Sequence, residues 1–307
     1  MTKIKILLII TIALVLSSPV LSSAEVMQEY YPSGKLKLEA NYKDNKMEGI
    51  AKLYYESGEL KLEGNFKNDK REGVAKFYYK SGEIQREENY KNDKLEGIVK
   101  GYIESGKLQY ESNYKNGKLE GEILLKYYEN GKLSAKENYK RNKKEGISKY
   151  YYKNGQLLAE DNFKEGKKEG ISKRYHESGQ LDMEVNFKDD KQEGVIKKYY
   201  KNGQLEEEGN YVNYTREGMF KGYYSNGILN FIRNYRNNKL EGVSKGYTKR
   251  GKLRVEINYK EGKKEGILKI YYDNGEYQYI DTYKSGKKIK RKAFTKRGKL
   301  EFEQDYQ

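Results

Sequence analysis

The sequence predicts an all-β protein: an elongated, single-layer antiparallel β-meander built from about eleven hairpin repeats of 24 residues. The first observation is a fixed period, because a Gly after Ser, Asn or Arg recurs from Gly34 to Gly298 in steps of 24, with one step of 25 and a last one of 23. Such a period marks a repeat array rather than a series of separate domains. The second is that turn-forming residues interrupt the chain every 8 to 10 residues, which favours strands over helices.

Each repeat is predicted to contain two short strands. In "KLKLEANY" (35–42), apolar Leu36, Leu38, Ala40 and Tyr42 alternate with polar residues, as in a strand with one wetter face. After Gly49, the segment "IAKLYY" is a second strand rich in strand-favouring residues. Charged residues make up 35% of the chain, which alone would favour disorder, but 33 Tyr and the strict period favour a folded sheet.

The turn between these strands is visible in "NYKNGKLEG" (113–121), which has near-copies along the chain. Two residues stand between the lysines, and the second is Gly, Asn or Asp in nearly every copy, as a two-residue type I′ turn requires. This register puts Tyr114 opposite Leu119 and Asn113 opposite Glu120, which predicts an Asn–Glu hydrogen bond. Tyr214 is the exception at the second turn position, so we expect its hairpin to be looser.

Three further features of the repeat carry structural expectations. The Gly of each Glu-Gly pair, as at Gly121, is expected to leave room for an aromatic side chain from a neighbouring strand. The extra residue of the 25-residue step, near 122–126, should form a bulge or a longer turn. Ile289-Lys290 replaces Glu-Gly in the last unit, which fits a divergent terminal cap.

Residues 1–24 differ from the rest and are predicted to be a signal peptide. Lys3 and Lys5 precede an apolar run over 6–16, and Ser22 and Ala24 are the small residues before a cleavage point. The alternative is a retained membrane anchor, but the apolar run is short for a membrane span. Residues 25–307 would then be one continuous repeat array with divergent terminal repeats and no transmembrane segment. We expect an exported protein that is periplasmic, on the cell surface or secreted.

The composition excludes several kinds of chemistry. The chain has no Cys, which excludes disulfides and thiolate chemistry, and its one His, His176, cannot assemble a usual zinc site. His176 stands where other repeats have Tyr, so it is interpreted as a substituted Tyr. The Glu of Glu-Gly recurs every 24 residues, which indicates a structural row, since active sites are few per protein. We therefore expect no enzyme activity, no catalytic or metal-binding residues and no cofactor.

The repeat resembles the MORN-repeat family in its bacterial variant form. The resemblance covers almost all of residues 28–307 and rests on an aromatic, a Gly three residues later and another Gly four further on, together with an upstream "YYxSGxL". These are Tyr114, Gly117 and Gly121; Phe163, Gly166 and Gly170; Tyr259, Gly262 and Gly266; and Tyr54, Tyr55, Ser57, Gly58 and Leu60. The middle Gly is often Asn or Asp here, and the usual Trp is Tyr or Phe.

This resemblance implies an elongated single-layered sheet used for protein contacts or membrane-surface association. Bacterial variant members are often labelled antitoxins of toxin–antitoxin systems. Similar repeats also precede the kinase domain of some phosphatidylinositol phosphate kinases, but the chain holds no glycine-rich phosphate loop or catalytic-loop motif.

Charge is expected to distinguish the two edges of the sheet. The chain has a formal net charge of +16, and all turns of the "KNGK" type lie on one edge, which should form a basic rim, while the other edge is close to balanced. The candidate binding residues on this rim are Lys115, Lys118, Lys140, Lys143, Lys144, Lys164, Lys167, Lys168, Lys260, Lys263 and Lys264. The alternative interpretation is that these lysines only keep the sheet soluble.

The expected function is that of an exported scaffold that binds a protein partner, whose identity the sequence does not reveal. One alternative is a peripheral binder of anionic lipid or glycan surfaces through the basic rim. A second is an antitoxin-like or immunity-like partner of an exported toxin. Tyr and basic residues together also suit nucleic acid, but export argues against that as the main role.

Overall fold

The computed structural model describes residues 24–306, apart from the side chains of 122–124, and in this range the chain forms 29 β-strands and no helix. Apart from Ala24, the predicted signal peptide lies outside the described residues. The chain divides into two compact units. Unit 1 comprises the residues up to Gly97 with Glu104–Gly106, and unit 2 comprises Ile98–Ile103 with the residues from Lys107 onward. The all-β fold class predicted from the sequence is confirmed.

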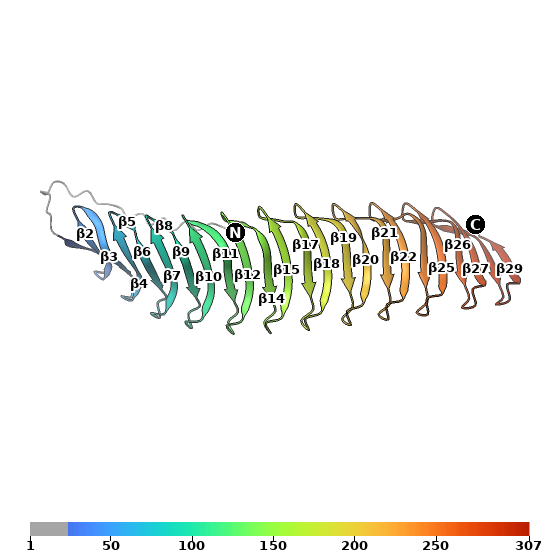
Figure 1. The fold of residues 1–307 in the computed structure, drawn as a ribbon, viewed down its shortest axis with the longest axis horizontal. Helices are drawn as coiled ribbons and strands as arrows, with labels where there is room; N and C mark the ends of the chain where they lie inside the picture. The colour runs from blue at the N-terminus through green and yellow to red at the C-terminus, as the bar shows by residue number, and fades with distance from the viewer. Residues whose placement is uncertain (1–23, 307) are drawn as a thin grey trace. The chain divides into compact units, whose positions relative to one another are not determined.

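Unit 1 is an antiparallel meander in which neighbouring strands pair (Figure 1). Its strands are β1 (Glu25–Tyr30), β2 (Leu36–Lys43), β3 (Lys46–Tyr54), β4 (Leu60–Lys67), β5 (Lys70–Arg71), β6 (Gly73–Tyr78), β7 (Ile84–Lys91) and β8 (Lys94–Leu95). β5 and β6 form one hairpin arm that is interrupted at Glu72, where the Glu72 amide donates to the Asn65 carbonyl.

Unit 2 repeats the same antiparallel pairing over more hairpins. Its strands are β9 (Gly97–Tyr102), β10 (Leu108–Lys115), β11 (Lys118–Tyr127), β12 (Leu133–Lys140), β13 (Lys143–Lys144), β14 (Gly146–Tyr151), β15 (Leu157–Lys164), β16 (Lys167–Lys168), β17 (Gly170–Tyr175), β18 (Leu181–Lys188), β19 (Lys191–Tyr199), β20 (Leu205–Val212), β21 (Thr215–Tyr223), β22 (Leu229–Arg236), β23 (Lys239–Leu240), β24 (Gly242–Tyr247), β25 (Leu253–Lys260), β26 (Lys263–Tyr271), β27 (Tyr277–Lys284), β28 (Lys287–Phe294) and β29 (Leu300–Asp305).

The two-residue turns have the predicted geometry. Asn116 and Gly117 have φ of 51° and 76°, positive at both positions as a type I′ turn requires, and Tyr114 pairs with Leu119. The first turn position also has positive φ at residues that rarely adopt it, such as Arg141 and Glu165. The hairpin at Tyr214 is not looser, which corrects that expectation: Asn213 and Tyr214 have φ of 48° and 62°, and Val212 pairs with Thr215.

The glycine of each Glu-Gly pair is required by the backbone conformation and not by the packing of an aromatic side chain. Its φ lies between 73° and 96° at all ten positions, a region that strongly favours Gly. At Gly121 the nearest side chain is the amide of Asn113, 3.4 Å from the place of a Cβ, so the expected aromatic does not cover it. Aromatic rings instead lie over glycines inside the strands, Tyr110 over Gly101, Phe220 over Gly209 and Phe231 over Gly222.

The predicted bulge of the 25-residue step is present in β11. Gly121 pairs with Tyr139 and Leu124 with Glu137, so two residues of β11, 122 and 123, stand opposite one residue of β12, Asn138. In the last repeat the register shifts between Thr282 and Tyr283, and the hairpin is completed by β28 and β29 without a Glu-Gly pair.

One face of the sheet holds the core, and we call it the core face. Small or apolar residues fill its centre: Ala40 is 1% exposed, and Phe220 is fully buried between the rings of Tyr211 and Tyr235 at centroid distances of 5.7 and 5.1 Å. Because the sheet is a single layer, the larger side chains that flank this centre must close over it. Edge-to-face aromatic pairs of this kind add about 0.5–1.5 kcal/mol each beyond the area that they bury.

Candidate interaction surfaces

The face opposite the core carries an exposed aliphatic side chain directly after Glu-Gly in nearly every repeat, the exception being the repeat in which Glu122 follows Gly121. Their exposed fractions lie between 43% and 60%. The members are Ile50 and Val74 in unit 1, and Ile98, Ile147, Ile171, Val195, Met219, Val243 and Ile267 in unit 2. Each lies in register with the polar residue of the next strand, as Ile147 does with Asn162. We call this surface the ladder face and its exposed residues the aliphatic row.

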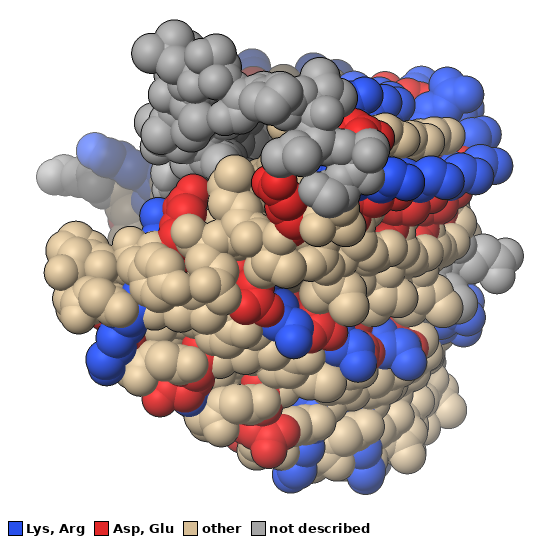
Figure 2. Space-filling model, turned by 90° about the vertical axis from the view of Figure 1, so that its left-hand side faces the viewer, with Lys and Arg blue, Asp and Glu red and all other residues tan. Residues whose placement is uncertain are grey.

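Next to the aliphatic row lies a band of paired charges. Lys149 Nζ lies 2.9 Å from Glu160 Oε1, and Lys52–Glu63, Lys173–Glu184 and Lys245–Glu256 repeat the pairing at 3.7, 3.6 and 3.3 Å. Figure 2 shows basic and acidic side chains in adjacent rows on the part of the surface that it displays. The ladder face therefore combines an apolar stripe with balanced charge.

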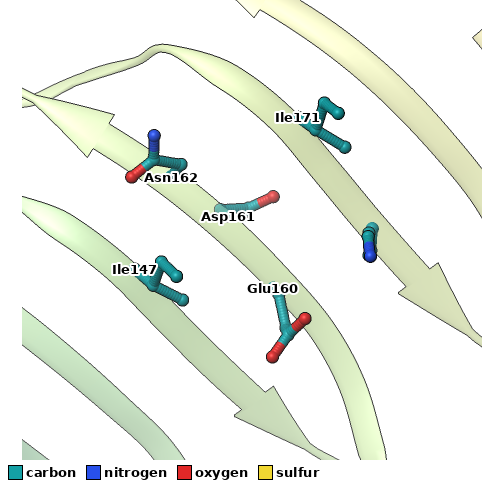
Figure 3. A pocket seen from close by; sticks show the side chains of 6 residues that line it. Ile147, Glu160, Asp161, Asn162 and Ile171 are labelled. Atoms are coloured by element: carbon teal, nitrogen blue, oxygen red, sulfur yellow. The ribbon is translucent and has the colours of Figure 1, made fainter.

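A shallow depression separates two members of the aliphatic row. It has a volume of about 350 Å³ and is lined by Ile147, Glu160, Asp161, Asn162, Ile171 and Lys173 (Figure 3). Ile147 and Ile171 lie on β14 and β17, on either side of β15, which carries Glu160 and Asn162. Its chemistry is mixed, apolar at the two Ile side chains and polar between them.

The expected Asn–Glu hydrogen bond uses the backbone of Glu. Asn113 Nδ2 donates to the carbonyl of Glu120 at 3.2 Å, and Asn186 donates to the Glu193 carbonyl at 2.7 Å. Each Glu carboxylate instead accepts a hydrogen bond from a backbone amide of the following repeat. Glu120 accepts the amide of Arg141 at 2.9 Å, and Glu169 accepts the amide of Asp189 at 3.0 Å. The Glu row is thus structural, as predicted, and it connects each turn to the next.

The rim formed by the two-residue turns, called the lysine rim, differs from its predicted composition. Lys143, Lys167 and Lys239 have ion pairs with Glu165, Asp189 and Glu261 of the following turns, at 2.8, 3.0 and 2.9 Å. Sequence reasoning counted the lysines and omitted the acidic turn residues between them. The other exposed rim candidates form no ion pair within 4 Å among the described residues, and they are Lys115, Lys118, Lys140, Lys164, Lys260 and Lys263.

Three of the candidate lysines lie on the core face and not on the rim. Lys144 Nζ lies 2.6 Å from Glu137 Oε1, and Lys168 Nζ lies 3.0 Å from Asp161 Oδ2. Lys264 lies over the ring of Tyr283, with Nζ 5.0 Å from its centroid. The residue after the second rim lysine begins the core-facing part of the strand, so the alternation of the strand directs these side chains inward.

Three carboxylates are buried on the core face of unit 2, those of Glu137, Asp161 and Asp281. Burial alone would raise the pKa of Glu137, but hydrogen bonds from Lys144 and Lys126 outweigh burial and lower it. The pKa of Asp161 is likewise lowered, because hydrogen bonds from Arg174 and Lys168 outweigh burial. Glu137 and Asp161 are therefore held ionised, and the basic residues around them have a structural use.

His176 lies at a turn of the rim opposite the lysine rim. The equivalent residue one repeat earlier is Tyr152, whose hydroxyl donates a hydrogen bond to the Tyr175 carbonyl at 2.8 Å. The turn at His176 keeps the backbone hydrogen bonds of the other turns on this rim. His176 Nε2 lies 3.4 Å from Asp182 Oδ1. Over residues 24–306, no three or more acidic or His side chains are grouped so as to hold a metal ion. In the same range, no helix is long and apolar enough to cross a bilayer.

The repeats match a known family model. The model for the MORN repeat variant matches residues 26–44, 47–68, 71–92, 95–116, 123–141, 144–165, 168–189, 192–213, 216–237, 240–261 and 264–285. The chain belongs to the MORN repeat variant family. MORN repeats generally build non-enzymatic scaffolds for protein or membrane contact. In this MORN chain the aliphatic row and the lysine rim are exposed.

Other comparisons give distant similarities. No curated protein matches the chain. Among solved structures, TcdB2-TccC3 matches with a TM-score of 0.18 and 12% identity over 92% of this chain. The Tc holotoxin pore of Photorhabdus luminescens matches with 0.18 and 10% over 89%, and a porin-like protein of Bacteroides uniformis with 0.19 and 9% over 94%. The MORN chain spans 19% of each of the first two chains and 96% of the third.

Proposed function

We propose that this MORN repeat chain is an exported, non-enzymatic scaffold that binds a protein partner along its ladder face. The aliphatic row carries the proposal. Single exposed apolar residues are common on protein surfaces, but here the same register position is aliphatic in successive hairpins of each unit, with a polar residue on the strand between, and such regular exposure favours an interaction surface. Strand propensity does not explain why these positions are aliphatic, because Thr also favours strands and would keep the face polar.

The charges beside the aliphatic row support a protein partner over an anionic surface. The Lys–Glu pairs leave little excess charge on this face, so electrostatic attraction to lipid headgroups would be weak there. An apolar stripe with a polar border is the usual composition of a protein interface. The depression between Ile147 and Ile171 offers a place for an apolar side chain of the partner.

Site-specific photo-crosslinking tests the docking face. A photoreactive residue at Ile171 or Val195 should crosslink a saturable protein partner in envelope extracts, whereas the same residue at exposed Lys201, on the opposite rim, should not. The variant Ile147→Ser, Ile171→Ser, Val195→Ser should reduce recovery of that partner about tenfold. Equal crosslinking from all three sites, or undiminished recovery, would refute the proposal. The identity of the partner separates a general scaffold from an immunity protein for an exported toxin.

Export has its own test. The N-terminal pattern of Lys3, Lys5, the apolar run over 6–16 and Ala24 supports cleavage before Glu25. The chain expressed with its full N-terminus in a bacterial host should be recovered outside the cytoplasm, and sequencing of the mature N-terminus should start at Glu25. Recovery of the uncleaved chain in the cytoplasm would contradict export and leave the docking face untouched.

A further inference from the structure

The strongest uncompensated charge of unit 2 lies at two neighbouring turns of the lysine rim, β10–β11 and β12–β13. Their four-residue tips hold Lys115, Lys118, Lys140, Arg141 and Lys143, all exposed, and no acidic residue. Lys143 is paired with Glu165 of the next turn, and the other four form no ion pair within 4 Å among the described residues. The Glu120 carboxylate accepts the backbone amide of Arg141. We call these five residues the basic pair of turns.

Two turns further along the same rim of unit 2 show the contrast. The tip at 188–191 holds Asp189 and Asp190 between its two lysines, and the tip at 212–215 holds no cation at all. Asp189 is also paired with Lys167 at 3.0 Å. A flat bilayer laid against this rim would meet these two tips of zero net charge together with the basic ones. The positive charge is therefore uneven along the rim and largest at the basic pair of turns, which fits a compact anionic ligand better than an extended membrane surface.

A second departure from the repeat coincides with the basic pair of turns. β11, which begins at the first of these turns and pairs with β12 leading to the second, is the ten-residue strand of the 25-residue repeat, and its register shifts between Gly121 and Leu124. Bulges are concentrated where a sheet adapts its edge or its side chains to a function. The two turns are two strands apart, about 10 Å, which an extended polypeptide spans with about three residues.

We propose that the basic pair of turns binds an acidic segment of a partner protein, extended across the two tips with its carboxylates facing Lys115, Lys118, Lys140 and Arg141. This inference rests on the proposed function as a protein-binding scaffold and adds the chemistry of the partner. The attraction is between exposed charges, so it contributes mainly to association rate and partner choice, and it weakens as salt rises.

Binding of a fluorescein-labelled oligoglutamate peptide tests the inference. The variant Lys115→Gln, Lys118→Gln, Lys140→Gln, Arg141→Asn should weaken binding about tenfold, since these exposed positions leave the turns intact and Asn occupies the Arg141 position in other repeats. The matched control Lys164→Gln, Lys167→Gln, Lys188→Gln, Lys191→Gln removes the same number of positive charges from two other turns. It should weaken binding less than about threefold.

Three results would overturn the inference. Equal loss in the two variants would show an effect of net charge alone. Binding by both variants as tight as by the parent chain would exclude the rim. Tighter binding to vesicles of phosphatidylglycerol and phosphatidylcholine than to the peptide, lost in both variants, would assign the whole rim to a membrane. In each case crosslinking from Ile171 remains a separate readout, so the proposed scaffold function stands or falls on its own.

Discussion

At the scale of single residues, the two-residue turns show how backbone conformation constrains the sequence. Both turn positions have positive φ in every hairpin of the lysine rim, and Asn, Asp or Gly occupies the second position in all of them but one. Where Asn or Asp stands there, its side chain often adds a bond to the preceding hairpin: Asn238 Oδ1 accepts the Arg216 amide at 2.7 Å. Tyr214 has φ of 62° and cannot supply this bond.

Tyr214→Asn should therefore stabilise the protein. Asn tolerates positive φ, and its Oδ1 would face the Gln192 amide as Asn238 faces Arg216, although the hydroxyl bond from Tyr214 to the Asp190 carbonyl is lost. We expect a gain of about 0.5–1 kcal/mol in the free energy of unfolding, measured by urea denaturation. Tyr214→Val, which is β-branched and disfavours positive φ, should lower stability. A loss with Asn would contradict the argument.

The buried carboxylates Glu137 and Asp161 predict the acid response. Their pKa values are lower in the folded chain than in the unfolded one, so their contribution is present at neutral pH and is lost as pH falls below about 4. Glu137→Gln with Asp161→Asn should be less stable at pH 7, because Lys144 and Arg174 lose their partners. Its stability should change less between pH 7 and pH 3. Parallel pH profiles of the two proteins would refute this.

At the scale of the hairpin, sequence and structure agree on the turns and differ on side-chain partners. The lysine spacing was sufficient to place the turn at Asn116-Gly117 and the pairing of Tyr114 with Leu119. It was not sufficient to identify the partner of the Glu120 carboxylate, which accepts the backbone amide of Arg141 in the next repeat. A hydrogen bond between repeats depends on how strands stack side by side, which a single hairpin sequence does not contain.

The candidate surfaces show the same limit. The aliphatic row was missed, although Ile, Val or Met follows nearly every Glu-Gly, because alternation does not reveal which face stays uncovered. Lys144 was placed on the rim because it follows Lys143 in the sequence, whereas strand alternation turns it toward Glu137. Sequence could count the rim lysines, but the ion pair of Lys167 with Asp189 required the stacking of two turns.

The glutamate connection between hairpins predicts a local effect. Glu217 Oε2 accepts the Asn237 amide at 3.0 Å, so Glu217→Ala leaves that turn amide without its acceptor. We expect a loss of about 1 kcal/mol in stability and faster hydrogen exchange at Asn237 than at amides two hairpins away. Glu177→Ala, at an exposed position on the opposite rim, is the control and should change neither quantity. Unchanged exchange at Asn237 would show that the bond does not hold the turn.

At the scale of the whole molecule, stability is a sum of neighbour interactions. Within each unit, strands pair with the strands that precede and follow them along the chain, and the two-residue strands lie beside these pairs. A repeat protein of this kind gains stability from each repeat and from each contact with its neighbour. Its tolerance to insertion or deletion should therefore follow the period of the sequence and not the length removed.

Deletion of residues 147–170 tests this directly. It removes one full period and joins Gly146 to Ile171, so that "EGISK" is restored at the junction and Arg174 takes the place of Tyr150 near Glu137. The shortened chain should fold cooperatively, with strand content per residue unchanged by circular dichroism and only a modest fall in melting temperature. Deletion of 147–169 leaves one residue more, which moves every following side chain of that arm to the opposite face. This control should unfold or aggregate, and equal stability of the two deletions would contradict an architecture governed by the repeat register.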